Sequence, residues 1–405
     1  MPAVRDHVHL AVALEGVGHH PAAWRSPATR PDRVFTAEHW LELVREAERG
    51  ALDFVRVDDA LGLGSDGQDR LRGRLDAVTV LARVAPVTER IGLIPAATTT
   101  HTEPFHVSTA LATLDFASRG RAGWWAKPST TEEETRLFGR KPLASPGELQ
   151  DESAEFIDVV GRLWDSWEDG AVIRDVPTGR FVDRERLHYV DFQGTYFDVR
   201  GPSITPRPPQ GRPVVAYSVT DEASLEIAAR DADVLFIDVA TPGQARKLRA
   251  QAHRVAEAAG RDPDTLRVLA DVTVVLGRTA AEAGRARRDL DDLDHESAPG
   301  ALQFTGTASG LADLVESWTA AGAVDGFTVL PALLPDGLTR LVDSVVPRLR
   351  ERGLFRDTYR SDTLRGHLGL ARPESRYARP TATATAPTAS DALAPVAPAT
   401  PVRTP

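Results

Sequence analysis

Short apolar segments alternate with helical patterns along this chain, and this alternation restricts the fold more than any other feature. The segments are rich in valine, isoleucine and alanine, as buried strands are. They span residues 8–15, 54–59, 91–98, 122–127, 214–219, 233–239, 266–276 and 327–333. Helical spacing of apolar residues is seen in 36–50, 106–118, 148–167, 221–232, 242–259, 280–294, 307–321 and 336–352. Strands that alternate with helices form parallel sheets, and eight of them favour an α/β fold of the closed (β/α)8 type, the TIM barrel.

Three parts of the chain depart from the alternation, and one of them is the acidic stretch 291–304, which we expect to be a loop. Residues 168–213 form an insertion in which "HYVDFQGTYFDV" predicts a small hairpin with Gln193 and Gly194 near its turn. An insertion of this kind is often a lid over an active site. Residues 378–405 are mostly alanine, proline and threonine, so we expect a disordered tail after one barrel domain covering residues 1–377.

Composition excludes several classes of function. The 405 residues include no cysteine, which rules out disulfides, thiol nucleophiles and thiolate metal sites. A net charge of −10 disfavours binding to nucleic acid. No run of 18 apolar residues and no secretory signal is present, so we expect a cytoplasmic protein without membrane contact. The sequence also lacks metal-ligand spacing, a nucleophile elbow and the glycine-rich turn of dinucleotide-binding sheets.

Reactive groups of such barrels lie at the C-terminal ends of the strands. The candidates at these positions are Asp58, Asp59, Thr98, Thr99, Thr100, His101, Trp125, Lys127, Tyr217, Ser218 and Asp221. Each has an alternative interpretation without function. Either aspartate after the second strand could cap the next segment, Lys127 could be solvated, and His101 could be a surface or hydrogen-bonded histidine. Asp221 is well placed to be the N-cap of the helix that follows it, and 132–134 to begin another helix.

Longer strings carry a family resemblance. They are "GHHPAAWRSP", "EHWLELVREAERGALDFVRVDDAL", "TTTHTEPFHVSTALATLDFASRGRAGW", "EFIDVVGRLWDSW", "HYVDFQGTYFDVRGPSITPRPPQGRPVV", "AARDADVLF" and "GTASGLADLVESWTAAGAVDGFTVLP". Together, from about residue 8 to 372, they resemble the bacterial-luciferase-like flavin-dependent monooxygenases, in the subgroup of the nitrilotriacetate and dibenzothiophene-sulfone monooxygenases. The resemblance implies a TIM barrel that uses O2 and reduced FMN, supplied by a separate flavin reductase, to oxidise a small organic substrate. It also implies a homo-oligomer, or a heteromer with a related subunit.

The resemblance further implies a set of flavin-contacting positions, several of which are altered here. Trp125 stands where the subgroup usually has a flavin-holding asparagine, and Ser129 closes the same motif. Gln150 stands in place of a tyrosine, and Pro146 in place of a histidine. Asp221 replaces a serine of the region that cradles the FMN phosphate, next to a helix N-terminus that normally attracts phosphate.

Other positions keep the family residues: Asp58 and the segment at Thr98. If an active flavin site remains, Lys127, Arg140 or Arg174 could neutralise the phosphate. Strand alternation predicts that Trp125 points into the barrel, with Asp58 as a candidate partner for its indole N–H. The sequence therefore leaves open a flavin-dependent monooxygenase with unusual contacts, a flavin-free enzyme or non-catalytic partner subunit, and a small-molecule binding protein.

Overall fold

Eight parallel strands close into a barrel in the computed structural model, which describes residues 7–63, 71–294 and 300–378. The barrel strands are β1 (His9–Leu14), β2 (Phe54–Val57), β3 (Gly92–Thr98), β4 (Gly123–Lys127), β9 (Val214–Val219), β10 (Val234–Ile237), β11 (Arg267–Leu276) and β13 (Gly326–Pro331). Each pairs in parallel with its neighbours, and the pairing of β10 with β11 completes the ring. The predicted TIM-barrel-like fold is therefore confirmed. A further strand, β12 (Gln303–Gly306), extends the sheet beside β11 and was not predicted.

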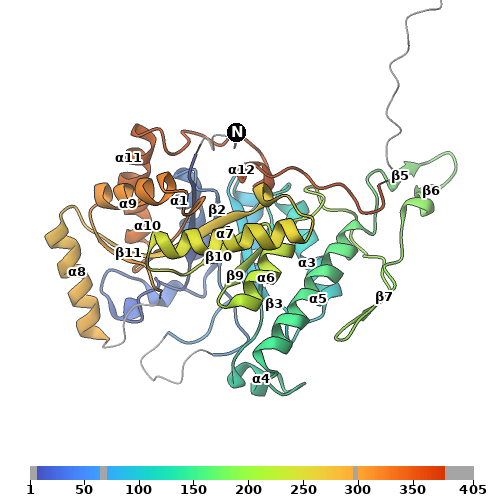
Figure 1. Cartoon of the computed structure of the whole chain (residues 1–405), viewed down its shortest axis with the longest axis horizontal. Coiled ribbons are helices and arrows are strands. Elements are labelled where there is room, and N and C mark those ends of the chain that lie inside the picture. Colours follow the sequence, from blue (N-terminus) through green and yellow to red (C-terminus); the bar gives the residue numbers. More distant parts are fainter. Residues whose placement is uncertain (1–6, 64–70, 295–299, 379–405) are drawn as a thin grey trace, which may run out of the picture.

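Helices surround the barrel (Figure 1). They are α1 (Ala37–Arg49), α2 (Ala77–Val84), α3 (Pro104–Ala117), α4 (Glu132–Phe138), α5 (Pro146–Asp165), α6 (Glu222–Asp231), α7 (Pro242–Ala258), α8 (Ala280–Leu293), α9 (Ala308–Ala320), α10 (Asp336–Arg340), α11 (Val346–Glu351) and α12 (Leu364–His367). A π-helical turn, Leu341–Val345, joins α10 to α11. Thr36 caps α1, because its side chain accepts a hydrogen bond from the backbone N–H of His39.

The two tryptophans of "GWW" divide between two cores. Trp124 faces outward, where it contacts Phe156 and Trp164 of α5, with ring centroids 5.7 and 6.5 Å away. Trp125 belongs to the core inside the barrel, together with Phe54 and Phe236. The predicted alternation at this strand is thus confirmed, and Trp125 points inward.

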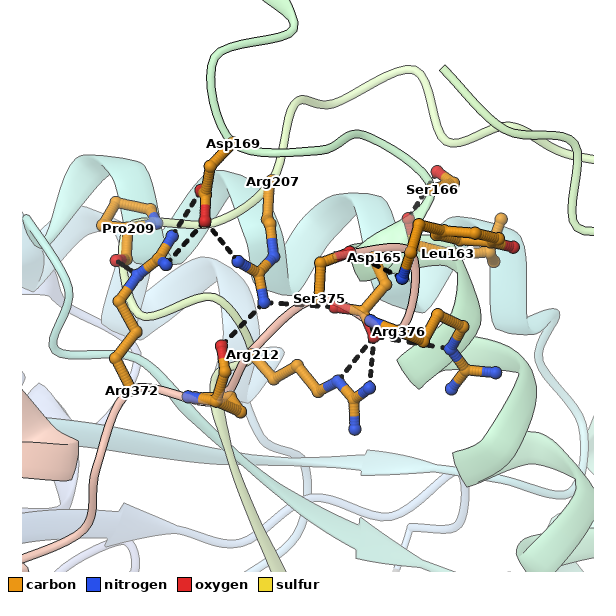
Figure 2. Close-up of polar contacts among 12 residues, drawn as sticks. Leu163, Asp165, Ser166, Asp169, Arg207, Pro209, Arg212, Arg372, Ser375 and Arg376 are labelled. Carbon is orange, nitrogen blue, oxygen red and sulfur yellow. Dashed lines mark hydrogen bonds and ion pairs between the residues drawn. The ribbon is translucent and has the colours of Figure 1, made fainter. Parts of the chain in front are cut away.

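The chain closes the N-terminal end of the barrel with its own C-terminal segment. Leu364 of α12 lies in the inner core, so close to β3 and β4 that a Cβ atom on Gly92 or Gly123 would press against its side chain. Polar contacts hold the segment farther along (Figure 2). Asp165, at the end of α5, accepts hydrogen bonds from Arg212 and Arg376, and Asp169 accepts them from Arg372.

The insertion carries two hairpins along α5. They are β5 (Val172–Asp175) with β6 (Arg180–Val182), and β7 (Phe192–Gln193) with β8 (Asp198–Val199). The second confirms the predicted hairpin, whose turn is closed by a hydrogen bond from Gly194 N–H to the carbonyl of Phe197. The hairpin β5–β6 lies beside the C-terminal segment, on the opposite side of the molecule from α4, which follows the C-terminal end of β4 (Figure 1). A lid over the C-terminal strand ends was therefore the wrong expectation for β5 and β6. The predicted tail, residues 378–405, lies outside the described residues apart from Ala378.

Candidate active site at the barrel mouth

A lysine–aspartate pair lies at the C-terminal ends of β2 and β4. The Nζ atom of Lys127 is 2.5 Å from Oδ1 of Asp58, and 3.3 Å from the carbonyl oxygen of Asp59. Both side chains are about 30% exposed, so the pair faces the solvent-accessible mouth. The interpretation of Lys127 as merely solvated is wrong. Asp59 does have the helix-terminal role considered for it, because its carboxylate accepts a hydrogen bond from the first N–H of α2, that of Ala77.

Trp125 forms the floor beneath this pair. Its indole N–H donates to the hydroxyl of Ser218 on β9 at 3.0 Å, so the suggested partner Asp58 was wrong. The Lys127 ammonium lies 5.0 Å from the ring centroid and the Arg56 guanidinium 4.6 Å from it, both within cation–π range. Trp125 is only 8% exposed. Because one hydrogen bond and two cations fix its orientation, the indole forms a rigid wall at the base of the mouth.

Arg56 and Asp271 join opposite sides of the barrel. The guanidinium of Arg56 on β2 donates two hydrogen bonds, of 3.1 and 2.8 Å, to the carboxylate of Asp271 on β11. It also lies over the ring of Phe236. Sequence reasoning missed this pair, although a charged residue at an inward-facing position of an otherwise apolar strand run was a usable signal.

Thr98 and Ser129, both among the positions that the resemblance assigns to the flavin, lie next to each other. Their hydroxyl oxygens are 2.8 Å apart, and the Ser129 backbone N–H donates to Thr100 Oγ1 at 2.8 Å. The threonine run therefore does more than fill the barrel, because it fixes the loop that follows β4. His101, by contrast, is buried against the ring of Phe138 at 5.2 Å. Within the described residues neither of its ring nitrogens has a hydrogen-bond partner, so a surface or hydrogen-bonded histidine was the wrong interpretation. Burial lowers the pKa of His101.

Gln150 and Asp221 lie at the other side of the mouth, where α5 and α6 begin. The Gln150 side-chain oxygen accepts a hydrogen bond from the Tyr217 hydroxyl at 2.7 Å, and burial raises the pKa of Tyr217 to about 12. Asp221 is the N-cap of α6, as considered from the sequence: its carboxylate accepts from Ser224 N–H at 2.7 Å. The Ser224 hydroxyl in turn accepts from Asp221 N–H. The side chains of Gln150 and Asp221 are thus both hydrogen-bonded to neighbouring groups of the protein.

The short helix α4 also reaches the mouth. Its start at Glu132 confirms the helix expected at the acidic run, and Thr131 with Glu134 forms a capping box. Glu134 additionally accepts a hydrogen bond from the backbone N–H of Leu61, after β2. This contact ties together two loops of the barrel mouth that lie far apart in the sequence.

Comparison with known proteins agrees with this architecture. The sequence matches the family described as Luciferase-like monooxygenase over residues 16–322, more than half of the chain. The chain belongs to this family. Family members act as monooxygenases on small organic substrates.

Individual relatives match over nearly their full lengths. N-acetyl-S-(2-succino)cysteine monooxygenase of Bacillus subtilis (strain 168) is 32% identical, over 94% of this chain and 100% of the relative. Nitrilotriacetate monooxygenase component A of Aminobacter aminovorans is 33% identical, over 92% and 98%. The solved structure of EDTA monooxygenase from Chelativorans sp. BNC1 superposes with a TM-score of 0.82 at 25% identity, over 90% of this chain and 99% of that one.

This luciferase-like monooxygenase has a cavity of about 320 Å³ next to the mouth. The loop after β1 forms one wall and the segment before α2 forms another. Asp58 belongs to its lining, so the cavity adjoins the pair that Asp58 makes with Lys127. The string "GHHPAAWRSP" forms part of this loop and supplies several residues of the lining. Among the described residues, no cluster suited to a metal ion and no helix long and apolar enough to cross a membrane is found.

Proposed function

We propose that this protein is a flavin-dependent monooxygenase that uses reduced FMN and O2 to oxidise a small organic substrate. The observation that carries the proposal is the family match over most of a barrel whose mouth brings Asp58, Lys127, Thr98 and Ser129 together. A reduced flavin would supply the electrons for splitting O2, with one oxygen atom entering the substrate and the other leaving as water. The protein's own part is to hold the reactants over the Trp125 wall and keep water out.

A separate flavin reductase is the proposed source of the reduced FMN. The relative from Aminobacter aminovorans carries the name component A, which describes one part of a multi-component enzyme. No second domain that could reduce the flavin is found in the described residues, which form one barrel with its insertion. Assembly with further copies or a related subunit is also part of the proposal.

The positions that the resemblance assigns to FMN do not fit it as they stand. A phosphate at the N-terminus of α6 would meet the carboxylate of Asp221, which the N–H of Ser224 fixes in place. Two like charges about 4 Å apart at intermediate dielectric repel by ~4 kcal/mol, and ~1.4 kcal/mol already changes affinity tenfold. Trp125 takes up space where an amide side chain was expected. We therefore propose that FMN binds weakly.

Of the cations considered as replacements, only Arg140 stays a candidate for the phosphate. Lys127 is already paired with Asp58. Arg174 lies on β5, in the hairpin away from the mouth. Arg140 follows α4 at the mouth with a side chain 64% exposed, and Glu103 is 3.9 Å away.

The test is oxygen transfer. The purified protein is supplied with FMN, NADH, a flavin reductase and a panel of small organic compounds under isotopically labelled O2, and products are analysed by mass spectrometry. Gain of one labelled oxygen atom, dependent on this protein, is the expected result. If flavin binding is measurable but no compound is oxygenated, a non-catalytic partner subunit becomes the better account. The comparisons do not favour that alternative.

A further inference from the structure

Polar and apolar groups contribute about equally to the lining of the cavity beside β1, and its apolar part is aromatic and branched. Trp24, Phe35 and Trp40 line it together with Val17, Val34, Leu71 and Leu75. Its volume of about 320 Å³ lies within the range of small-molecule sites. Trp40 presents its ring rather than its polar edge, because its indole N–H already donates to the carbonyl of Val34 at 3.1 Å.

Charges in this cavity do not suit an anion. Two carboxylates, Glu15 and Asp58, belong to the lining, of which Asp58 is paired with Lys127, and Arg74 is the only arginine or lysine among the described lining residues. Recognition of a polycarboxylate needs several cations, ideally arginines that bind each carboxylate in a bidentate way. A molecule with two or three carboxylates would instead meet one arginine and the carboxylate of Glu15.

The two lining histidines do not make the cavity suitable for an anion. His20 has a lowered pKa because it is buried, so it is neutral at neutral pH. Its Nδ1 accepts from Ala22 N–H, and its Nε2–H points to Asp291 at 3.2 Å. His19 lies between the carbonyl of Ala13 and the carboxylate of Glu15, at 3.2 and 3.5 Å. Both rings are therefore already engaged with groups of the loop and its neighbours.

We propose that this cavity is the substrate compartment and that it takes an uncharged molecule with an aromatic or branched hydrocarbon part that packs against the aromatic and branched side chains of the lining. This inference rests on the proposed function and makes it more specific. It separates the protein from relatives whose names specify polycarboxylates, because their substrate class would be rejected here. Asp58 and Lys127 at the inner end would then face the reacting part of the molecule.

Ligand-observed saturation-transfer NMR on the full-length protein tests the proposal without flavin or turnover. The uncharged probes are indole and dibenzothiophene sulfone, and the anionic probes are nitrilotriacetate and succinate. We expect saturation transfer to the uncharged probes and none to the anions. Phe35→Asp, at a rim position that is 52% exposed, should weaken binding of the uncharged probes at least tenfold. Phe181→Asp, a matched change at a 62% exposed phenylalanine on β6, should leave it unchanged.

Three results would overturn the proposal: stronger transfer to the anions, no transfer to either uncharged probe, or equal effects of the two substitutions. Binding of the uncharged probes without oxygen transfer in the labelled-O2 experiment would contradict only the proposed function. The two failures are therefore distinguishable.

Discussion

Trp125 and Asp221 are the residues on which the cofactor question depends. One fills the barrel interior beneath the mouth and the other caps a helix that would otherwise attract a phosphate. Both also stabilise the fold, Trp125 as part of the inner core and Asp221 as an N-cap. Serine is also a good N-cap, so Asp221→Ser should change the free energy of unfolding by less than about 1 kcal/mol.

The Asp221→Ser variant is therefore expected to bind FMN at least tenfold more tightly than the parent, because a negative charge next to the phosphate is removed. Isothermal titration calorimetry with FMN measures the change. Asp262→Ser is the control, since Asp262 caps a short 3-10 helix before β11. Equal affinities of parent and Asp221→Ser variant would mean that the phosphate binds elsewhere.

His367 makes stability depend on pH. It is buried at the N-terminal end of the barrel, where its Nε2–H donates to the carbonyl of Arg90 at 2.6 Å, and burial lowers its pKa to about 4. Between pH 4 and 6.5 the unfolded chain binds the proton more readily than the folded one. The free energy of unfolding should therefore fall as the pH drops through this range, by up to about 3 kcal/mol from this residue.

His367→Gln should remove that part of the pH dependence. Chemical denaturation at pH 7 and at pH 4.5 gives the difference for parent and variant. His106→Gln, at an exposed position on α3, is the matched control and should behave as the parent does. A difference that is the same in parent and His367→Gln variant would show that His367 is not responsible.

At the scale of elements, a single carboxylate of α5 accepts backbone hydrogen bonds from the turn between β7 and β8. Glu155 accepts hydrogen bonds from three successive backbone N–H groups, those of Thr195, Tyr196 and Phe197, at 2.7–2.9 Å. Glu155→Ala should therefore increase amide hydrogen exchange at these residues by at least tenfold, because the donors lose their acceptor. Asp151→Ala, one turn earlier on α5, should leave exchange unchanged. Unchanged exchange in both variants would mean that the turn is held by its own backbone.

The sequence predicted elements well where periodicity was strong and poorly where tertiary contacts decide. All eight barrel strands and helices such as α1 and α5 follow from alternation and helical spacing. The four-residue α12 was missed because it has no periodicity of its own; Leu364 inserts into the barrel instead. In the site, the inward direction of Trp125 followed from the two-residue period of a strand. Its partner Ser218 could not be predicted, because which side chains pair between neighbouring strands is not encoded in the local sequence.

At the scale of the whole molecule, the C-terminal segment completes the fold by closing the barrel. Leu364 fills the space beside Gly92 and Gly123, and Arg365 donates to the carboxylate of Asp233 before β10. Truncation after Asp362 should therefore lower the melting temperature steeply or prevent folding. Truncation after Ala378 should leave it within error, because the composition of 379–405 offers no core-forming face.

Leu364→Ala is a milder change than truncation. It should lower the free energy of unfolding by about 2–5 kcal/mol, as replacing a buried leucine by alanine generally does. Calorimetric scans compare all three proteins with the parent. A truncation after Ala378 that melts several degrees lower would show that the tail docks on the barrel. A Leu364→Ala variant with the same melting temperature as the parent would contradict the role of α12 in closing the barrel.

Anaerobic titration with reduced FMN, followed by tryptophan fluorescence, tests the central claim most directly. The account predicts measurable but weak binding by the parent, with a dissociation constant well above micromolar. It also predicts clear tightening in the Trp125→Asn, Asp221→Ser double variant, in which ring space and phosphate site are both restored. A submicromolar dissociation constant for the parent, or a double variant that binds no better, would contradict the account.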